Sequence, residues 1–464
     1  MMRPRLGSFM VMLALVGAGS AVALPDGSVS ASTRAGGNLL WAARYDNQGI
    51  DDRAQAVTVS PDGTRVFVTG YSPTSDWSDA DYATLAYDAA TGVNLWTRRY
   101  AGPAGGLDQA NAIAVSPDGT MVFVTGASEG DGNDYLTVAY DALDGAELWQ
   151  ERYSGPGGGD KDDWPGAVVV SPDGSRVFVI GTSEGPSTTS DYATLAYDAS
   201  TGRPLWIRRY TSRCPTCDDV ATHGTLSPDG STLFVTGASE GKSDPDFVTI
   251  AYDSVTGSTR WRVRTDFQSR NEFLAASIAV SPDGKKVFVT GDSEGDYTES
   301  AYATVGYEAA TGAELWRALF SRSPHLRAFA RAGAVSADGS LVFVTGSSDS
   351  SDGSDWVTLA YEAQTGARAW KSVYDRAVGE SASAMGVSPE GAKVFVTGGT
   401  GGDYATVTYD STSGSELWEA RYDAFTGDDL AENLAVGPDG SKVFVTGYSE
   451  SVNGEDYLTL AYEA

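Results

Sequence analysis

The chain has 464 residues, with 62 acidic residues against 32 Lys and Arg and a formal net charge of −30. This acidity argues against binding to nucleic acid or to anionic membranes, because Lys and Arg supply the affinity for both. With 41% hydrophobic and 11% aromatic residues the chain can bury a core and is not disordered. Two cysteines and two histidines exclude a disulfide framework and leave little material for histidine-based catalysis.

The N-terminus has the pattern of a secretory signal. Arg3 and Arg5 precede an apolar stretch over residues 8–19 that is too short to span a bilayer, and Ala21-Val22-Ala23 is an A-x-A cleavage motif. An N-terminal anchor helix is the alternative. No later segment is apolar for long enough to cross a membrane. We therefore expect a secreted or cell-envelope protein without a membrane span.

These features divide the chain into three parts. We expect a signal peptide at 1–23 and a flexible lead-in, rich in Ser, Ala and Gly, at 24–36. The remaining residues, 37–464, are expected to form one domain because a single unit repeats throughout them.

The repeat is marked by a turn tripeptide, Pro-Asp-Gly or a variant of it, at intervals of 49 to 56 residues. Its glycines are Gly63, Gly119, Gly174, Gly230, Gly284, Gly339, Gly391 and Gly440. A fixed period near this length, without helical patterning, is typical of a propeller or an array.

Each unit contains four predicted strands. In the second unit they cover 110–116, 121–126, 134–141 and 146–153, and all are rich in β-branched and aromatic residues or alternate in polarity. The first two flank Pro-Asp-Gly, in which proline presets φ and glycine accepts a positive φ. Eight such units predict an all-β fold, an eight-bladed β-propeller of four-stranded antiparallel blades.

The two ends of the chain predict how the ring closes. The last unit stops at Ala464, after its third strand, and the missing fourth strand carries the motif L-W-x-x-R-Y. That motif lies near the N-terminus, at 40–45, so we expect the N-terminal strand to complete the last blade. Eight tryptophans then share one repeat position and should pack blade against blade: Trp41, Trp96, Trp149, Trp206, Trp261, Trp316, Trp370 and Trp418.

The third and fourth strands resemble a known repeat. Residues 86–96, 196–206 and 251–261 fit A-x-D-x-x-T-G-x-x-x-W, the tryptophan-docking repeat of the quinoprotein (pyrroloquinoline quinone, PQQ) dehydrogenase-like propellers. The resemblance covers 37–464 and implies the propeller fold. The units also resemble secreted bacterial propeller-repeat proteins of unknown function, which favours a bacterial origin.

The catalytic features of the quinoprotein dehydrogenases do not carry over. In that family the quinone lies beside a disulfide of adjacent cysteines, with Ca²⁺ held by acidic and amide ligands, whereas Cys214 and Cys217 are separated by two residues. A zinc site needs about four ligands and a thioredoxin-like site needs a βαβ setting. We therefore expect a local disulfide between Cys214 and Cys217 that stiffens the loop between two blades.

Acidic residues form two regular sets. One precedes the aromatic residue that opens the third strand: Asp81, Asp134, Asp191, Asp246, Asp355, Asp403 and Asp456, with Ala301 in the fifth unit. We expect these to bond the loop backbone, because seven equivalent positions suit a structural task. The other set precedes the first strand: Asp51-Asp52, Asp108, Asp162-Asp163, Asp218-Asp219, Glu272, Glu380 and Asp428-Asp429.

Antiparallel topology places both sets on one face of the propeller, around the mouth of the central channel. Clustered carboxylates suit hard cations such as Ca²⁺, and the alternative is a solvated acidic surface. The candidate metal ligands are Asp52, Asp108, Asp163, Asp219 and Asp429.

The sequence contains no convergent set of catalytic residues. We therefore expect a secreted, non-enzymatic binding or scaffold propeller, whose acidic loop face takes a cation, a polar ligand or a protein partner. A PQQ-dependent dehydrogenase is the alternative that the resemblance implies, and a hydrolase or lyase using channel carboxylates is a third possibility.

Overall fold

The structure is a computed structural model. It describes residues 36–47, 51–74, 79–158, 161–214, 216–240, 246–267, 275–294, 300–322, 326–351, 353–377, 379–423, 427–451 and 454–464, together with short strands at 22–23 and 28–31. Within these residues no helix is long and apolar enough to cross a membrane. The signal-peptide prediction falls almost entirely outside the described residues.

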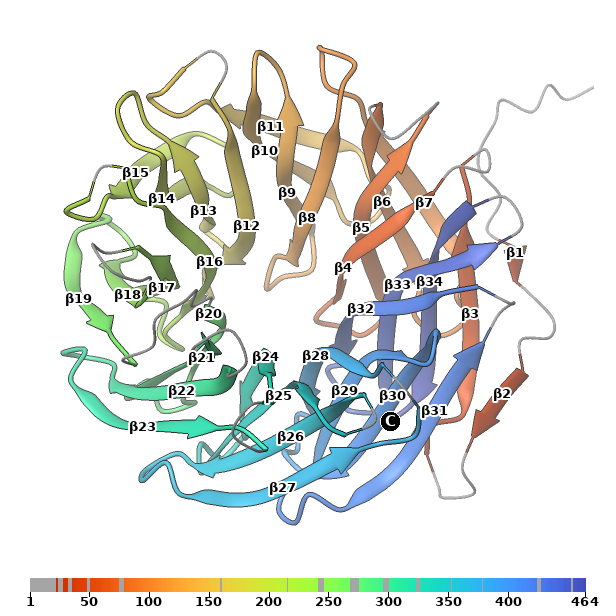
Figure 1. The fold of residues 1–464 in the computed structure, drawn as a ribbon. Coiled ribbons are helices and arrows are strands. Elements are labelled where there is room, and N and C mark those ends of the chain that lie inside the picture. The colour runs from red at the N-terminus through yellow and green to blue at the C-terminus, as the bar shows by residue number, and fades with distance from the viewer. Residues whose placement is uncertain are drawn as a thin grey trace, which may run out of the picture.

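Eight antiparallel sheets are arranged as blades around one axis (Figure 1). Blade 1 holds β4 (Arg53–Val59), β5 (Arg65–Pro73), β6 (Ala80–Asp88) and β7 (Asn94–Tyr100). Blade 2 holds β8 (Asp108–Val115), β9 (Met121–Glu129), β10 (Asn133–Asp141) and β11 (Glu147–Tyr153). Blade 3 holds β12 (Asp163–Val170), β13 (Arg176–Glu184), β14 (Ser190–Asp198) and β15 (Pro204–Tyr210). Blade 4 holds β16 (Asp219–Leu226), β17 (Thr232–Ser239), β18 (Asp246–Asp253) and β19 (Thr259–Thr265).

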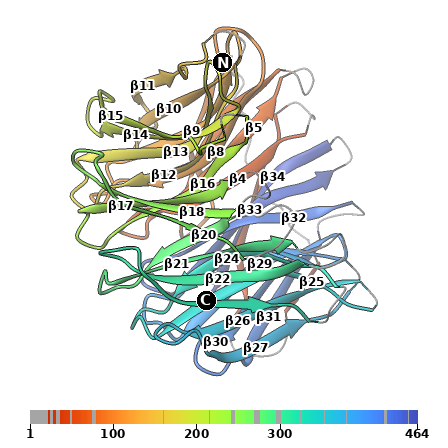
Figure 2. The same ribbon diagram turned by 60° about the vertical axis from the view of Figure 1, so that its left-hand side comes forward.

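The second half of the ring repeats this order (Figure 2). Blade 5 holds β20 (Ala275–Val280), β21 (Lys286–Glu294), β22 (Ser300–Glu308) and β23 (Glu314–Phe320). Blade 6 holds β24 (Ala328–Val335), β25 (Leu341–Asp349), β26 (Ser354–Glu362) and β27 (Arg368–Tyr374). Blade 7 holds β28 (Ser381–Val387), β29 (Lys393–Thr400), β30 (Asp403–Asp410) and β31 (Glu416–Asp423). Blade 8 holds β32 (Asp429–Val436), β33 (Lys442–Ser451) and β34 (Gly454–Glu463), completed by β3 (Leu39–Tyr45).

Blade 8 closes the ring as predicted. β3 pairs antiparallel with β34, with Trp41 opposite Ala461 and Tyr45 opposite Tyr457. The Gly37 amide donates to the Glu463 carbonyl (2.8 Å). The same hydrogen bond closes the turn between the third and fourth strands of other blades, as from the Gly92 amide to the Asp88 carbonyl (2.8 Å). The eight-bladed fold and its closure by the N-terminal strand are therefore confirmed.

Two short strands extend the sheets at the outer rim. β1 (Val22–Ala23) pairs with β3, and β2 (Ser28–Ala31) pairs with β31 of blade 7. β2 lies within the segment expected to be a flexible lead-in, so part of that segment has regular structure. An outermost strand exposes unpaired backbone groups, which any extended neighbouring segment can satisfy.

The repeated tryptophans join each blade to the next, as predicted. Trp206 of blade 3 lies between Phe178 of its own blade and Tyr252 of blade 4, with ring centroids 5.8 and 6.1 Å away. Its indole N–H donates to the Ser254 carbonyl (3.1 Å). Gly257 has a φ of +68° in the turn between β18 and β19, and a Cβ there would lie 2.6 Å from the indole. Glycine is therefore needed beside each tryptophan.

Candidate functional site

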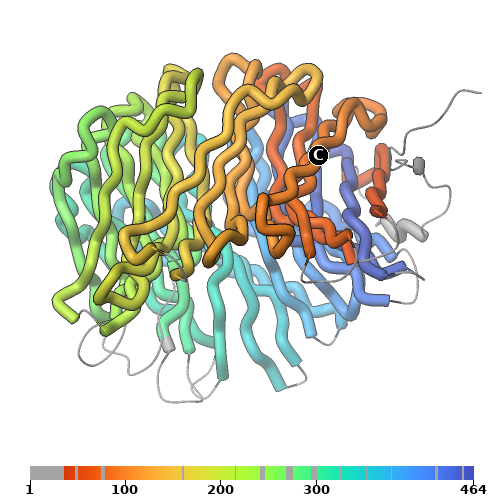
Figure 3. The backbone as a smooth tube through the Cα atoms, turned by 90° about the horizontal axis from the view of Figure 1, so that it is seen from above, coloured from red at the N-terminus to blue at the C-terminus, as the bar shows by residue number. Residues whose placement is uncertain are grey.

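The loops before the first strand and between the second and third strands of each blade lie on one face, which we call the loop face. The Pro-Asp-Gly turns lie on the other, the turn face; Figure 3 shows the strands running between them. A line of polar side chains, the polar row, crosses blades 1 to 4 and blade 8 beside the loop face. In blade 3, Asp163 pairs with Ser183, which pairs with Asp191. Arg209 of β15 binds Asp191 (2.7 Å), the Ser183 carbonyl (2.7 Å) and the Tyr153 hydroxyl of blade 2 (3.3 Å).

The polar row recurs around the ring. The arginine of L-W-x-x-R-Y binds the aspartate that opens the third strand in five blades: Arg44–Asp456, Arg99–Asp81, Arg152–Asp134, Arg209–Asp191 and Arg264–Asp246. In blade 6, Asp355 binds Arg322 from the preceding loop instead. Blade 5 has Ala301 and Leu319 at the two positions, so both charges are missing together. In blade 7 the arginine, Arg421, binds Glu419. These aspartates therefore have a structural role, but their partners are arginine side chains and not the loop backbone expected from the sequence.

Of the acids that precede the first strand, the ones adjacent to the strand or opening it are buried, whereas Asp218 and Asp428 are exposed. Asp52, Asp108, Asp163, Asp219 and Asp429 are each at most 2% exposed. Four of them accept a hydrogen bond from the backbone amide of the loop before them: Asn47 to Asp52 (2.6 Å), Gly102 to Asp108, Gly155 to Asp163 and Ser212 to Asp219. They therefore hold the loops that join the blades and do not form the solvated acidic surface considered from the sequence.

The five candidate metal ligands lie in five different blades, so the structure does not bring them to one ion. Burial is the main cause that raises the pKa of Asp108, Asp163 and Asp219, and hydrogen bonds from the serines of the polar row partly oppose it. Burial also raises the pKa of Asp52 to about 7.

Substitution of Asp163 tests this loop-holding role. Asp163→Ala is expected to lower the free energy of unfolding by about 1–3 kcal/mol, because the buried Gly155 amide loses its acceptor. Asp163→Asn keeps an acceptor oxygen. The raised folded-state pKa makes the contribution of Asp163 to stability complete below its unfolded pKa, about 3.9, and lost as pH rises through the folded value. The Asn variant should therefore gain stability relative to wild type as pH rises. Denaturant unfolding at several pH values measures this, and parallel pH profiles would contradict it.

One of these acids belongs to a larger group. Asp46, Asp52 and Asp456 each place one carboxylate oxygen within 4.8 Å of the others, at the junction where blade 8 meets blade 1. Asp456 also binds Arg44 (2.6 Å), and the nearby Asp456 charge contributes to the raised pKa of Asp52, after burial. Of the five candidate metal ligands, Asp52 is thus the one that the described residues surround with further carboxylates.

Next to the repeated acids, the first strands contain a position whose residue type varies from blade to blade. In the blades that have the buried acid, the residue after it lies between that acid and a small residue, usually alanine, which pairs with the glycine of V-T-G. Phe329 has the equivalent position in blade 6, where Ala328 replaces the acid. A Cβ on Gly126 would lie 1.9 Å from the Gln109 carbonyl, so the backbones require glycine there. The varying positions are partly or fully exposed, and we call them the inner ring: Arg53, Gln109, Trp164, Val220, Phe329, Ser381 and Leu430.

The inner ring combines aromatic, apolar and charged groups. The indole of Trp164 is 38% exposed, an unusual exposure for a tryptophan in this protein, where the eight repeated ones are at most 8% exposed. Arg53 binds Glu455 (2.8 Å) and lies over the Tyr448 ring, 4.5 Å from its centroid. The sequence does not reveal this ring, because only the strand register shows that these residues are equivalent.

In the acid pairs Asp162-Asp163 and Asp218-Asp219, the two members bind different parts of the chain, which the sequence did not show. The second member binds its own loop, while the first accepts from the backbone of the preceding blade: Asp162 from the Asn133 amide (3.1 Å) and Asp218 from the Ser190 amide (3.2 Å). Glu272 lies outside the described residues.

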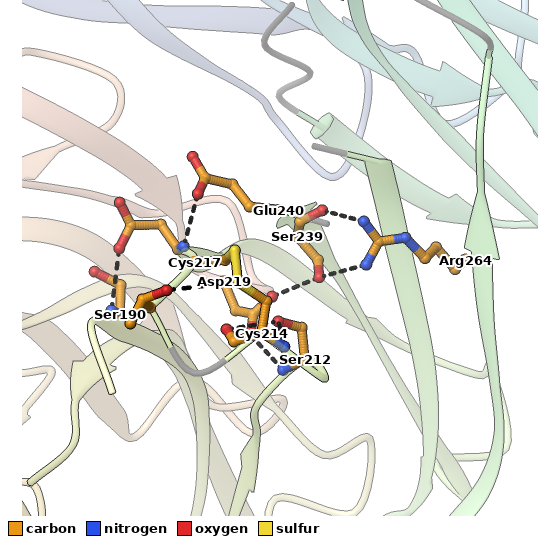
Figure 4. Close-up of a disulfide and its surroundings, with 10 residues drawn as sticks. Ser190, Ser212, Cys214, Cys217, Asp219, Ser239, Glu240 and Arg264 are labelled. Carbon is orange, nitrogen blue, oxygen red and sulfur yellow. Dashed lines mark hydrogen bonds between the residues drawn. A yellow bond between two sulfur atoms is a disulfide. The ribbon is translucent and has the colours of Figure 1, made fainter. Parts of the chain in front are cut away.

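Cys214 and Cys217 form a disulfide in the loop between blades 3 and 4 (Figure 4). The Cys217 amide donates to the Cys214 carbonyl (3.1 Å), so the bridge closes a single turn. On one side of it the Ser212 amide binds Asp219 (2.5 Å), and on the other the Asp218 amide binds Glu240 (3.1 Å). The bridge therefore fixes a loop that the polar row already anchors.

Solved structures of similar fold have unrelated tasks. Sqt1 from Chaetomium thermophilum, bound to the N-terminus of ribosomal protein L10, has a TM-score of 0.60 at 17% identity, over 90% of this chain and 98% of that one. BamB from Moraxella catarrhalis has a TM-score of 0.51 at 15% identity, over 94% and 98%. Quinohemoprotein alcohol dehydrogenase from Comamonas testosteroni has a TM-score of 0.56 at 13% identity, over 92% and 76%. At these identities the likeness shows the fold alone.

No curated protein sequence matches the chain. A family model does match, over residues 11–244 and 245–456, and its description is outer membrane protein assembly factor BamB. Since these two matches cover almost the whole repeat, the chain belongs to the BamB-like family of PQQ-like β-propellers.

Proposed function

We propose that the protein is a secreted or cell-envelope scaffold without enzymatic activity, which binds a protein partner over the inner ring on its loop face. One observation carries this proposal. The buried acids and the alanine–glycine pairs are nearly the same from blade to blade, whereas the inner-ring residues between them differ. Varying side chains on a rigid scaffold are where binding specificity usually lies. The ring contains an exposed tryptophan, Trp164, and an arginine, Arg53, and both residue types are enriched in protein interfaces.

The family supports the same conclusion. Its model is named for an assembly factor, and Sqt1, a propeller of similar fold, was solved with a segment of another protein bound. The buried acids, which a hydrolase or a dehydrogenase would need, are engaged with arginines, serines and loop amides in blade after blade.

Trp164→Ala tests the proposal. A protein recovered with wild type by affinity purification should be lost from Trp164→Ala and kept by Ser175→Ala, a matched change on the turn face of the same blade. Equal recovery by both variants would contradict the proposed surface. Turnover of an alcohol or sugar by the purified protein after addition of PQQ and Ca²⁺ would contradict the absence of enzymatic activity.

We also propose a site for the cation that the sequence suggested. We place Ca²⁺ at Asp46, Asp52 and Asp456, because a divalent cation would neutralise three carboxylates held within 4.8 Å. Ca²⁺ is expected to raise the midpoint of thermal unfolding of wild type and of Asp163→Asn, but not of Asp52→Asn. An unchanged wild-type midpoint, or a shift that Asp52→Asn retains, would contradict this site.

A further inference from the structure

The repeat forms a groove on the rim of the loop face, where the end of one outer strand meets the outer strand of the next blade. Between blades 1 and 2 the groove has a volume of about 450 Å³ and is lined by Tyr100, Ala101, Pro103, Leu136, Gln150 and Arg152. Between blades 3 and 4 it has a volume of about 350 Å³ and is lined by Tyr210, Thr211, Ser212, Arg213, Cys214, Glu240, Arg262 and Arg264. We call the second one the arginine groove.

The two grooves share a framework and differ in charge. Tyr100 corresponds to Tyr210 in the repeat, and Arg152 to Arg264. At the position two residues before this arginine, blade 2 has Gln150 and blade 4 has Arg262. With Arg213 in its loop as well, the arginine groove has three guanidinium groups and one carboxylate among its lining residues, whereas the blade 2 groove has a single guanidinium and no carboxylate.

The three arginines are not equivalent. Arg264 belongs to the polar row, where Asp246 compensates its charge and the Ser239 carbonyl accepts a hydrogen bond (2.8 Å). Arg262 instead lies over the Tyr210 ring, 4.8 Å from its centroid. Among the described residues neither Arg262 nor Arg213 forms an ion pair with a carboxylate. Two guanidinium groups are therefore available to a ligand.

The walls of the arginine groove are held in place (Figure 4). Arg213 lies between Ser212, whose amide binds Asp219 (2.5 Å), and Cys214 of the disulfide. Glu240, the one carboxylate, already accepts from the Asp218 amide (3.1 Å). A groove with a fixed shape loses little entropy when it takes a ligand.

We propose that the arginine groove binds a small oxyanion-bearing ligand, a carboxylate or a phosphate, between Arg213 and Arg262. Guanidinium groups bind two oxygens of such anions at once. The cationic character of the groove is notable because the chain has a net charge of −30, which repels anions from the rest of its surface. This site lies on the outer rim and is independent of the inner ring.

Calorimetric titration with inorganic phosphate and with citrate, at an ionic strength held constant with NaCl, tests the proposal. Arg262→Gln gives the groove the side chain of its blade 2 counterpart and should weaken binding at least about tenfold, the effect of losing one charge-assisted contact. Arg317→Gln is the matched control. Arg317 occupies the same repeat position in blade 5 but is already paired with Glu314, so binding should be unchanged.

Saturable binding of either anion that only Arg262→Gln weakens would support the site. Binding of phosphate alone would assign a tetrahedral ligand, and binding of citrate alone a carboxylate. Absence of binding by wild type would overturn the proposal. So would equal affinities of wild type and Arg262→Gln, or an equal loss in both variants, since these indicate diffuse attraction and not a site.

Discussion

A chain that begins at Asp46 is expected not to form a stable closed propeller, whereas one that begins at Gly36 should. The shorter chain lacks β3, which supplies the fourth strand of blade 8. It also loses Trp41, which lies between Phe444 of blade 8 and Tyr87 of blade 1 and donates to the Ala89 carbonyl (3.2 Å). Loss of one buried tryptophan costs about 3–5 kcal/mol, a large part of the 5–15 kcal/mol by which domains are typically stable.

The exposed edge adds a second penalty. Without β3, the backbone of β34 loses its pairing partner, and the cluster that holds Leu458 and Leu460 loses the packing of Ala42. An unpaired strand edge favours pairing between molecules. Size-exclusion chromatography and thermal unfolding should show aggregation and no cooperative transition for the chain from Asp46. A monomer with the same unfolding midpoint as the chain from Gly36 would contradict closure by β3.

Arg209→Leu should destabilise the protein strongly, by about 3–5 kcal/mol, because it leaves the buried carboxylate of Asp191 without its cation. The protein itself offers the compensating change, since blade 5 has Ala301 and Leu319 at these positions. The double variant Asp191→Ala/Arg209→Leu should therefore be more stable than Arg209→Leu alone.

Urea unfolding of the wild type, the two single variants and the double variant forms a complete cycle. The slope m should stay constant, so that changes in the midpoint report stability. If the double variant lost as much free energy of unfolding as the two single variants together, Asp191 and Arg209 would act separately. That result would contradict the ion pair described in the polar row.

The sequence predicts the ring because its signals are local and repeated. The turn tripeptide, the four strand patterns and the displaced L-W-x-x-R-Y motif each lie within a few residues, and together they specify eight blades and the closing strand. The arginine of that motif and the aspartate of the third strand are separated by 18 residues in blade 3, at 191 and 209, and only the register joins them.

The burial of the acids could not be predicted in the same way. Each first strand contains a bulge, which in blade 3 lies between Pro165 and Ala167. The bulge changes the face of the sheet on which the residues before it lie. A pattern of alternating residues therefore does not show that Asp163 is buried and Trp164 exposed. This is why the regular acids suggested an exposed surface, and why the inner ring was not found.

Site-specific photo-cross-linking from the inner ring tests the central claim most directly. A photoreactive amino acid at position 164 lies on the loop face, and the same amino acid at position 175 lies on the turn face of the same blade. If the loop face binds a protein partner, position 164 should give discrete adducts in the cells that make the protein, and position 175 should not. The same adducts from both positions, or none from position 164, would contradict it.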